Sequence, residues 1–252
     1  MSETRPTTVR VSVICGPEAW DPETGHVRLT SRWFRWFVRW VSEYEPTRLT
    51  VNVGIEKEPN IADSRSIAIR EAKRHKPEFA VQVDTDVIVE NTLEDTVRLL
   101  LDDRHRGYGI VTSPGRSAEG KLEVMWDVAG HNASGTSPWT VDHSWGGFLS
   151  FWRGVYLGME PVGYYTSIAN AKTDAYCMFV PYHPCPHCGK EIEGMGEDVS
   201  LIRQAQKAGG IECADPRIRT THLKIAGIKS FREGDVVSKG EGPNEFLLEA
   251  KG

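Results

Sequence analysis

The sequence lacks any apolar run of the roughly 18 to 20 residues that a membrane-spanning helix requires. Its first residues, Met1–Pro6, lack the apolar core of a secretory signal. An excess of positive charge is also missing, because the formal net charge is −5. This balance excludes a basic footprint for nucleic acid over the whole chain, although a local basic face is still compatible with it. From these absences we expect a cytoplasmic protein.

Cysteine is scarce, and its number is odd: the chain has five, scattered apart from one Cys-x-x-Cys pair. This usage fits a reducing compartment better than a disulfide framework. No internal repeat, low-complexity block or clear linker divides the 252 residues. We therefore predict one domain over residues 1–230, with halves at about 1–113 and 114–230, followed by a Gly- and charge-rich tail at 231–252.

The first half alternates between two hydrophobic patterns. Short Val- and Ile-rich runs predict strands, and longer runs with helical spacing predict helices between them. The expected strands are Val9–Ile14, Leu49–Val53, Phe79–Val83 and Tyr108–Thr112, and the expected helices are Ser31–Glu43, Ile61–His75 and Thr92–Leu101. This order predicts an α/β fold with a parallel, doubly wound sheet that presents ligands at the carboxyl ends of its strands.

The second half is less regular, with strands predicted at Gly147–Trp152 and Ala175–Val180 and a helix at Val199–Ala208. The helix at Ser31–Glu43 should place its aromatic residues on one face and its arginines on the other. The aromatic face comprises Trp33, Phe34, Trp36, Phe37, Trp40 and Val41, and the basic face Arg32, Arg35 and Arg39. Tryptophans at this spacing indicate core packing rather than a stacking platform.

The segment Asp84-Thr85-Asp86 follows the buried-looking strand FAVQV. Two carboxylates two residues apart favour a cation between them, and Mg²⁺ or Mn²⁺ prefers oxygen ligands completed by waters and substrate phosphates. Such a metal neutralises a diphosphate and helps it to leave. The alternative is a loop in which one of these aspartates caps the next helix. For the preceding helix, at Ile61–His75, the possible caps are Asp63 and Ser64.

Three further groups carry candidate chemistry. Arg65 stands at a helix start. Its guanidinium either donates two hydrogen bonds to a phosphate or is exposed to solvent. Glu197 and Asp198 follow Gly194-Met-Gly and open a helix, where they serve either as acceptor-side carboxylates or as first-turn stabilisers. His222, in Arg219-Thr-Thr-His-Leu, is a candidate ligand or a structural histidine.

The stretch from His183 to Lys190 resembles a zinc-ribbon knuckle. Cys185 and Cys188 in Cys-x-x-Cys-Gly can share one Zn²⁺, but a structural site needs four ligands and no second pair exists. Candidate completions are Cys177, His183, His187 and Cys213. A turn with two free thiols is the alternative.

In this order and spacing, the motifs resemble the GT-A glycosyltransferases with an Asp-x-Asp motif. The likeness is strongest to compact stand-alone enzymes of bacteria and their phages, and it covers roughly Val9 to Leu223. It implies a GT-A fold: a mostly parallel central sheet, flanking helices and a small antiparallel element. A bacterial or phage-infected cell is the implied setting.

The resemblance also implies roles for individual residues. Gly16 and Pro17 would border the nucleotide base, Arg65 would contact the nucleotide or diphosphate, and Trp145, Gly146 and Gly147 would line the donor-sugar pocket. Asp84 would touch the ribose or a metal-bound water, while Asp86 and His222 would ligate Mn²⁺ or Mg²⁺. Glu197 and Asp198 would face the acceptor, with Asp198 as the candidate base. Many relatives have Asn where Asp63 or Ser64 precedes the arginine, so this chain departs from the pattern there.

The expected function is transfer of a sugar from a nucleotide diphosphate donor, with a UDP-sugar expected, to an acceptor hydroxyl. The acceptor is open among a glycan, a protein and a hydroxymethylated base of phage DNA, the last served by a local basic face of Arg32, Arg35, Arg39, Arg116, Arg217 and Arg219. Whether the sugar is transferred with inversion or retention also stays open. The alternatives are a nucleotidyltransferase, which Cys15-Gly16-Pro17-Glu18 matches poorly, and a non-catalytic zinc-binding module.

Overall fold

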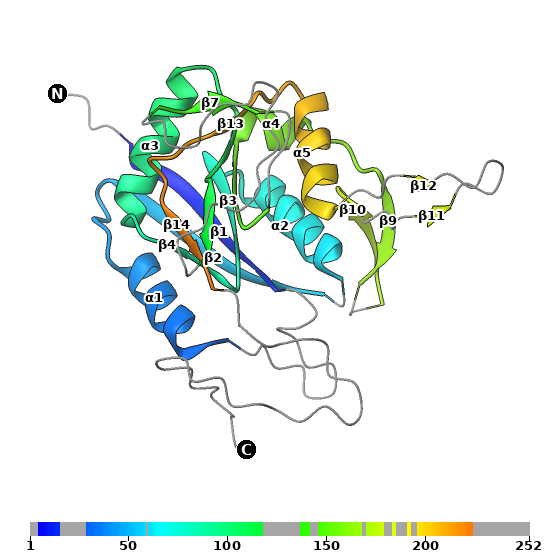
Figure 1. The fold of residues 1–252 in the computed structure, drawn as a ribbon, viewed down its shortest axis with the longest axis horizontal. Helices are drawn as coiled ribbons and strands as arrows, with labels where there is room; N and C mark the ends of the chain where they lie inside the picture. The colour runs from blue at the N-terminus through cyan, green and yellow to red at the C-terminus, as the bar shows by residue number, and fades with distance from the viewer. Residues whose placement is uncertain are drawn as a thin grey trace, which may run out of the picture.

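The computed structural model describes residues 5–15, 29–58, 60–117, 137–141, 146–167, 170–178, 183–184, 191–192 and 196–223. Within these ranges the chain forms five helices and fourteen strands, and seven of the strands make up a central sheet (Figure 1). In chain order they are β1 (Thr7–Cys15), α1 (Ser31–Ser42), β2 (Leu49–Lys57), α2 (Ile61–His75), β3 (Phe79–Asp84), β4 (Val87–Val89), α3 (Leu93–His105), β5 (Ile110–Thr112), β6 (Gly115–Ser117), β7 (Trp139–Thr140), β8 (Phe148–Trp152), α4 (Arg153–Gly158), β9 (Gly163–Thr166), β10 (Lys172–Ala175), β11 (His183–Pro184), β12 (Glu191–Ile192), α5 (Glu197–Lys207), β13 (Glu212–Ala214) and β14 (Thr220–His222).

The central sheet has seven strands in the order β2-β1-β3-β8-β5-β13-β7. β1 pairs in parallel with β2 and β3, and β13 pairs in parallel with β5. β8 is antiparallel to both of its neighbours, β3 and β5, and β7 is antiparallel to β13. The α/β class and the mostly parallel sheet are therefore confirmed. The two antiparallel strands, β8 and β7, both come from the less regular second half of the sequence.

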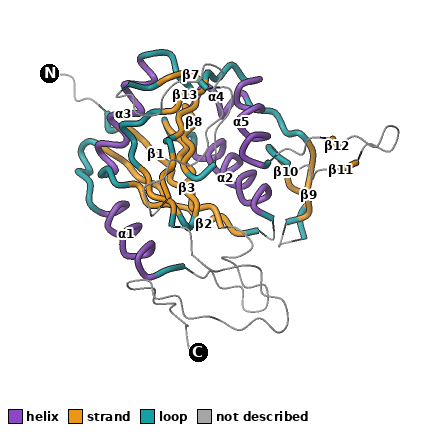
Figure 2. Tube along the Cα trace, in the orientation of Figure 1, coloured by secondary structure: helices purple, strands orange, loops and turns teal. Residues whose placement is uncertain are grey.

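Helices cover both faces of this sheet, as Figures 1 and 2 show. On one face, the aromatic side chains of α1 and the leucines of α3 pack on the odd-numbered valines of β1 and β3. On the other face, α2, α4 and α5 pack around Ala80, Ile110, Leu149 and Phe151. This three-layer packing buries both sides of the central strands β1 and β3, whereas β2 at the edge of the sheet is partly exposed.

A second, three-stranded sheet has the order β4-β14-β6. β4 pairs antiparallel with β14, and β14 pairs in parallel with β6. The sequence pattern did not indicate β4, because three residues between two acidic segments carry too little periodicity. This small sheet brings the end of the described chain back to the segment that follows β3. The hairpin of β9 and β10 forms the additional antiparallel element, and β11 and β12 form another two-stranded pair.

The predicted helices agree with the structure to within a few residues, and α2 matches at both ends. Its cap, however, is Asn60, whose side chain accepts a hydrogen bond from the backbone N–H of Ala62, so the choice of Asp63 or Ser64 is wrong. On α1, Trp33, Phe37 and Trp40 are buried, but Phe34 is 49% exposed and does not belong to the core face. The strand predicted at Ala175–Val180 is also wrong, since β10 ends at Ala175 and residues 176–178 are not in a strand.

Candidate functional site

The candidate site lies where β3 ends, at the carboxyl edge of the parallel strands. Asp84 is the last residue of β3, and a turn over Thr85 and Asp86 leads into β4. The Nε2 atom of His222 on β14 lies 2.6 Å from Oδ2 of Asp86. The β4–β14 ladder places these two side chains together, because Val87 is the register partner of His222. The structure thus brings together two of the residues that the sequence singled out separately.

The imidazole nitrogen and the carboxylate oxygen share a hydrogen bond, and both are ligand types that a divalent cation such as Mn²⁺ accepts. In the part of the chain that the structure describes, no group of three or more His, Cys, Asp or Glu side chains could hold a metal ion. Mg²⁺ beside phosphates is usually bound by one or two protein carboxylates, with waters and substrate oxygens as its other ligands.

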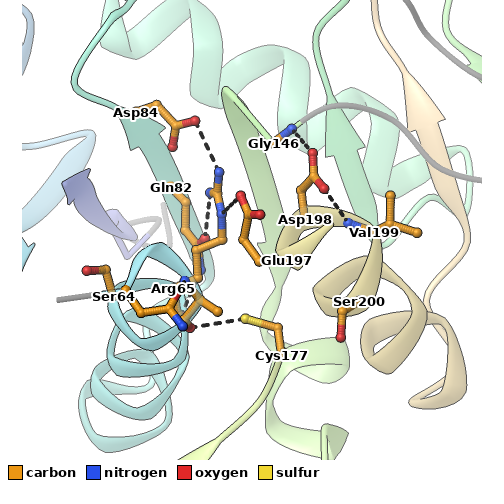
Figure 3. Close-up of polar contacts among 12 residues, drawn as sticks. Ser64, Arg65, Gln82, Asp84, Gly146, Cys177, Glu197, Asp198, Val199 and Ser200 are labelled. Atoms are coloured by element: carbon orange, nitrogen blue, oxygen red, sulfur yellow. Dashed lines mark hydrogen bonds and ion pairs between the residues drawn. The ribbon is translucent and has the colours of Figure 1, made fainter. Parts of the chain in front are cut away.

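Arg65 is the hub of the neighbouring polar cluster (Figure 3). It projects from the first turns of α2 and is 1% exposed, so the interpretation of Arg65 as a solvated residue is wrong. One terminal nitrogen donates to Oδ2 of Asp84 at 3.1 Å, and the other donates to Oε1 of Gln82 at 3.4 Å. Its Nε lies 3.5 Å from Oε1 of Glu197. Arg65 therefore joins the end of β3 to the first turn of α5.

Burial and the guanidinium of Arg65 act in opposite directions on the pKa of Asp84. Its side chain is 20% exposed. Burial raises its pKa to about 7; the guanidinium of Arg65 acts to lower it, and the nearby Asp86 and Glu197 carboxylates act to raise it. Its Oδ1 atom is buried and has no hydrogen-bond partner within the described residues. A cation or a donated hydrogen bond at this position would favour the ionised form.

Asp198 occupies a different position in the first turn of α5. Its Oδ2 accepts a hydrogen bond from the backbone N–H of Gly146 at 2.9 Å, and its Oδ1 accepts one from Val199 at 2.7 Å. The amino end of α5 favours negative charge at Glu197 and Asp198. Each carboxylate oxygen keeps a second lone pair, so Asp198 can still accept a proton or a hydroxyl hydrogen bond.

Gly146 and Gly147 connect the two sides of the site. The carbonyl of Gly147 accepts from the backbone N–H of Asp84 at 3.1 Å, which extends the β3–β8 ladder. A Cβ at Gly146 would lie 2.5 Å from the terminal nitrogen of Arg65 and 2.7 Å from Cβ of Asp198. Only glycine fits here without a shift of its neighbours. The sequence identified this position, but not the close approach to Arg65 that requires it.

Several predicted site residues lie outside the described residues. Gly16, Pro17 and Trp145 belong to this group, as do Cys185, Cys188 and His187 and the side chain of His183. Their roles stay predictions. Of the other zinc candidates, Cys177 is buried, with its thiol donating to the carbonyl of Ala62 at 3.1 Å, and burial raises its pKa to about 12. Cys213 is buried in β13.

The predicted basic face is only partly formed by exposed arginines. Arg32, Arg35 and Arg39 are exposed on α1, and the Arg219 side chain is 66% exposed. Arg217 is used internally instead, with ion pairs to Asp102, Asp103 and Asp215. The Arg116 side chain lies outside the described part.

Sequence reasoning missed Gln82 as a member of the site. A polar residue in a buried strand, two residues before Asp84, lies on the same face as Asp84, because side chains alternate along a strand. That signal was present in FAVQVD. The part played by Trp33 of α1 was missed as well. Its indole N–H donates to the carbonyls of Asp84 and Val87, and spacing alone cannot indicate such a contact.

No protein-family model matches the sequence, and no curated protein matches it. Among solved structures, A197 from STIV is similar with a TM-score of 0.46 and 10% identity, over 91% of this chain and all of that one. GalNAc-T7, solved with UDP, GalNAc and Mn²⁺, is similar with a TM-score of 0.44 and 14% identity, over 88% of this chain and 44% of that one.

A third similar structure is from Desulfovibrio desulfuricans G20 and is described as a nucleotide-diphospho-sugar transferase. Its TM-score is 0.35 and its identity 11%, over 84% of this chain and 79% of that one. All three likenesses are distant. No helix in the described part of the chain is both long and apolar enough to cross a membrane.

Proposed function

We propose that this protein is a metal-dependent glycosyltransferase, which moves a sugar from a nucleoside diphosphate to an acceptor hydroxyl. The observation that supports this proposal is the meeting of Asp86 with His222 at the carboxyl edge of β3, 2.6 Å apart. Open α/β sheets bind their ligands at this edge. A donor set of one carboxylate and one imidazole leaves most of a cation's coordination to a diphosphate and water, as a leaving-group metal requires.

Asp86 and His222 would hold Mn²⁺ or Mg²⁺, which neutralises the departing diphosphate when it is bound. Arg65 acts as a positioning residue, since its fork is occupied by Asp84 and Gln82 and it is almost fully buried. A direct contact of Arg65 with the diphosphate remains a prediction. The expected donor is a UDP-sugar, with Gly16, Pro17 and Trp145 expected around it and Gly146 and Gly147 at the sugar.

On the acceptor side, Asp198 is the proposed base. The acceptor oxygen forms a bond to the anomeric carbon, the bond from that carbon to the diphosphate oxygen breaks, and the hydroxyl proton passes to the Asp198 carboxylate. The Gly146 hydrogen bond fixes Asp198 next to the glycines expected to line the sugar pocket. Glu197, held beside Arg65, would bind acceptor hydroxyls. These roles apply to an inverting transfer; with retention, Asp198 would be a binding residue.

The acceptor is proposed as a glycan, a protein or a modified DNA base. The exposed arginines of α1 lie on the helix that contacts the Asp84–Val87 turn through Trp33, and they supply cationic charge on an otherwise acidic chain. A screen of nucleotide sugars for hydrolysis and transfer, with all three acceptor classes present, distinguishes these options.

Donor binding can be tested by thermal denaturation with UDP and Mn²⁺. A ligand at 100 times its Kd stabilises the folded chain by about 2.7 kcal/mol, which predicts a rise in melting temperature of roughly 5 °C or more. Asp86→Ala and His222→Ala should abolish the rise. His75→Ala is the matched control, because His75 is exposed on α2 and pairs only with Glu71 among the ion pairs found. No rise in the wild-type chain with any nucleoside diphosphate would contradict the proposal.

A further inference from the structure

Helix α1 presents three indole groups to one edge of the β4 segment. The N–H of Trp33 donates to the carbonyl of Val87 at 2.8 Å, that of Trp36 to Val89 at 2.7 Å, and that of Trp40 to Asn91 at 3.0 Å. Carbonyls of alternate residues point to the same edge of a strand, so this edge would otherwise carry unpaired acceptors. The three indole N–H groups donate the hydrogen bonds that a neighbouring strand would otherwise supply.

The opposite edge of this segment pairs with β14. Val87 is in register with His222, and the backbone N–H of Leu223 donates to the carbonyl of Asp86 at 2.6 Å. β4 is thus held from both sides. β14 supplies His222 on one side, and α1 supplies the indoles on the other.

Trp33 differs from the other two tryptophans because its indole N–H contacts two backbone carbonyls. Its N–H also lies 3.2 Å from the carbonyl of Asp84, so one indole spans the turn that carries Asp86. The ring is 1% exposed and stacks on Phe37 with centroids 4.8 Å apart and planes at 11°. A ring packed in this way cannot rotate to follow a displaced turn.

We propose that Trp33 is a positioning residue for the metal site, acting through the Asp84–Val87 turn to keep Asp86 against His222. The inference rests on the proposed function. A core role alone would give all three tryptophans an effect on stability and none on the metal. Trp33 and Trp40 belong to the same buried cluster, Trp36 packs against it, and each donates its indole N–H to β4 or the residues that follow it. The positioning role predicts that only Trp33 affects the metal.

The test compares Trp33→Phe with Trp36→Phe and Trp40→Phe. Isothermal titration measures the Kd for Mn²⁺ in the presence of UDP, and thermal denaturation of the ligand-free chains measures stability. All three variants should lower the melting temperature. Trp33→Phe should also weaken Mn²⁺ binding by about 10-fold or more, the usual effect of losing a group that orients a metal ligand. The two controls should change it by less than about 2-fold, within the variation of a neutral site.

If Trp33→Phe does not fold, benzothienylalanine at the same positions keeps the ring shape and removes only the N–H donor. Wild-type Mn²⁺ affinity in the Trp33 variant overturns this inference alone. Equal weakening in all three variants also overturns it, since that outcome reveals a general core effect. A wild-type chain that binds neither Mn²⁺ nor UDP overturns the proposed function and this inference with it.

Discussion

A methyl group at Gly146 would lie 2.5 Å from the terminal nitrogen of Arg65, which shows how closely the backbone before β8 approaches that guanidinium. The same backbone donates its N–H to Asp198 at 2.9 Å. One glycine therefore sits between the residue that braces Asp84 and the proposed base. The spacing between the donor and acceptor sides of the site depends on the absence of a side chain at this position.

Gly146→Ala should therefore reduce activity much more than stability. Either Arg65 or the first turn of α5 must move, and an error of about 1 Å in catalytic geometry can cost roughly 100-fold in rate. Steady-state kinetics with the identified donor measure this loss as a fall in kcat. Gly163→Ala is the matched control, because a Cβ there meets nothing within 4 Å. A Gly146→Ala enzyme with wild-type kcat would show that the close approach is not needed.

Arg65→Met should destabilise the fold and also weaken donor binding. Removing the guanidinium leaves Asp84 and Glu197 in a largely buried site without their cation, and losing one partner of a buried pair costs about 3 to 5 kcal/mol. Denaturant unfolding measures the free energy of unfolding, and the UDP and Mn²⁺ titration measures binding.

Arg10→Met provides the control for that experiment. Arg10 is also buried and pairs with Glu56 at 2.7 Å, on β1 and β2 rather than at the end of β3. It should lose similar stability but retain the Kd for UDP and Mn²⁺ at a temperature where the protein is folded. Equal loss of binding in both variants would contradict a specific bracing role for Arg65.

Asp198→Asn should separate catalysis from binding. The amide oxygen can keep one of the two backbone hydrogen bonds that Asp198 accepts, but the side chain can no longer take the acceptor proton. General-base catalysis contributes typically 100- to 10,000-fold, so kcat should fall by about that factor while the Kd for UDP and Mn²⁺ stays the same. Asp95→Asn, at a half-exposed position of α3, is the control. Undiminished kcat in Asp198→Asn would exclude the base role.

The sequence predicted the central layers well because they depend on local patterns. Val- and Ile-rich runs and helical spacing located β1, β3 and α2, and both faces of the sheet are covered as expected. β8 could not be placed by the same reasoning. Its five residues predict a strand, but the direction of pairing depends on a long connection that carries no periodic signal.

The candidate site, too, could be predicted from the sequence only in part. Asp84, Asp86, Asp198 and His222 could be selected by the order and spacing of their motifs along the chain, although each motif alone is common. Their contacts could not, since Asp86 and His222 are 136 residues apart and meet through a three-residue strand. Trp33 was assigned correctly to the core, but the acceptors of its N–H depend on tertiary structure.

A buried acidic cluster lies outside the candidate site. Asp103 on α3 and Asp215 after β13 are both fully buried, and Arg217 pairs with each of them as well as with Asp102. Burial, reinforced by the charge of Asp215, raises the pKa of Asp103 from its ordinary value of 3.8 to about 8, and Arg217 opposes this rise. The folded chain therefore retains a proton on the coupled pair of Asp103 and Asp215 up to a higher pH than the unfolded chain does.

The sign of the resulting pH dependence follows from proton binding. Between about pH 4 and pH 8 the folded chain holds a proton on Asp103 that the unfolded chain releases, so the free energy of unfolding should fall as the pH rises through this window. Asp103→Asn removes that proton exchange, while its side-chain oxygen can still accept the hydrogen bond from Arg217. The free energy of unfolding of the variant minus that of the wild type should therefore be larger at pH 8 than at pH 5. Denaturant unfolding at both pH values measures this difference. Asp84, whose pKa is also raised, should leave a smaller slope of the same sign in the variant. If the variant and the wild type show identical slopes, Asp103 is ionised in the folded chain and Arg217 dominates the cluster.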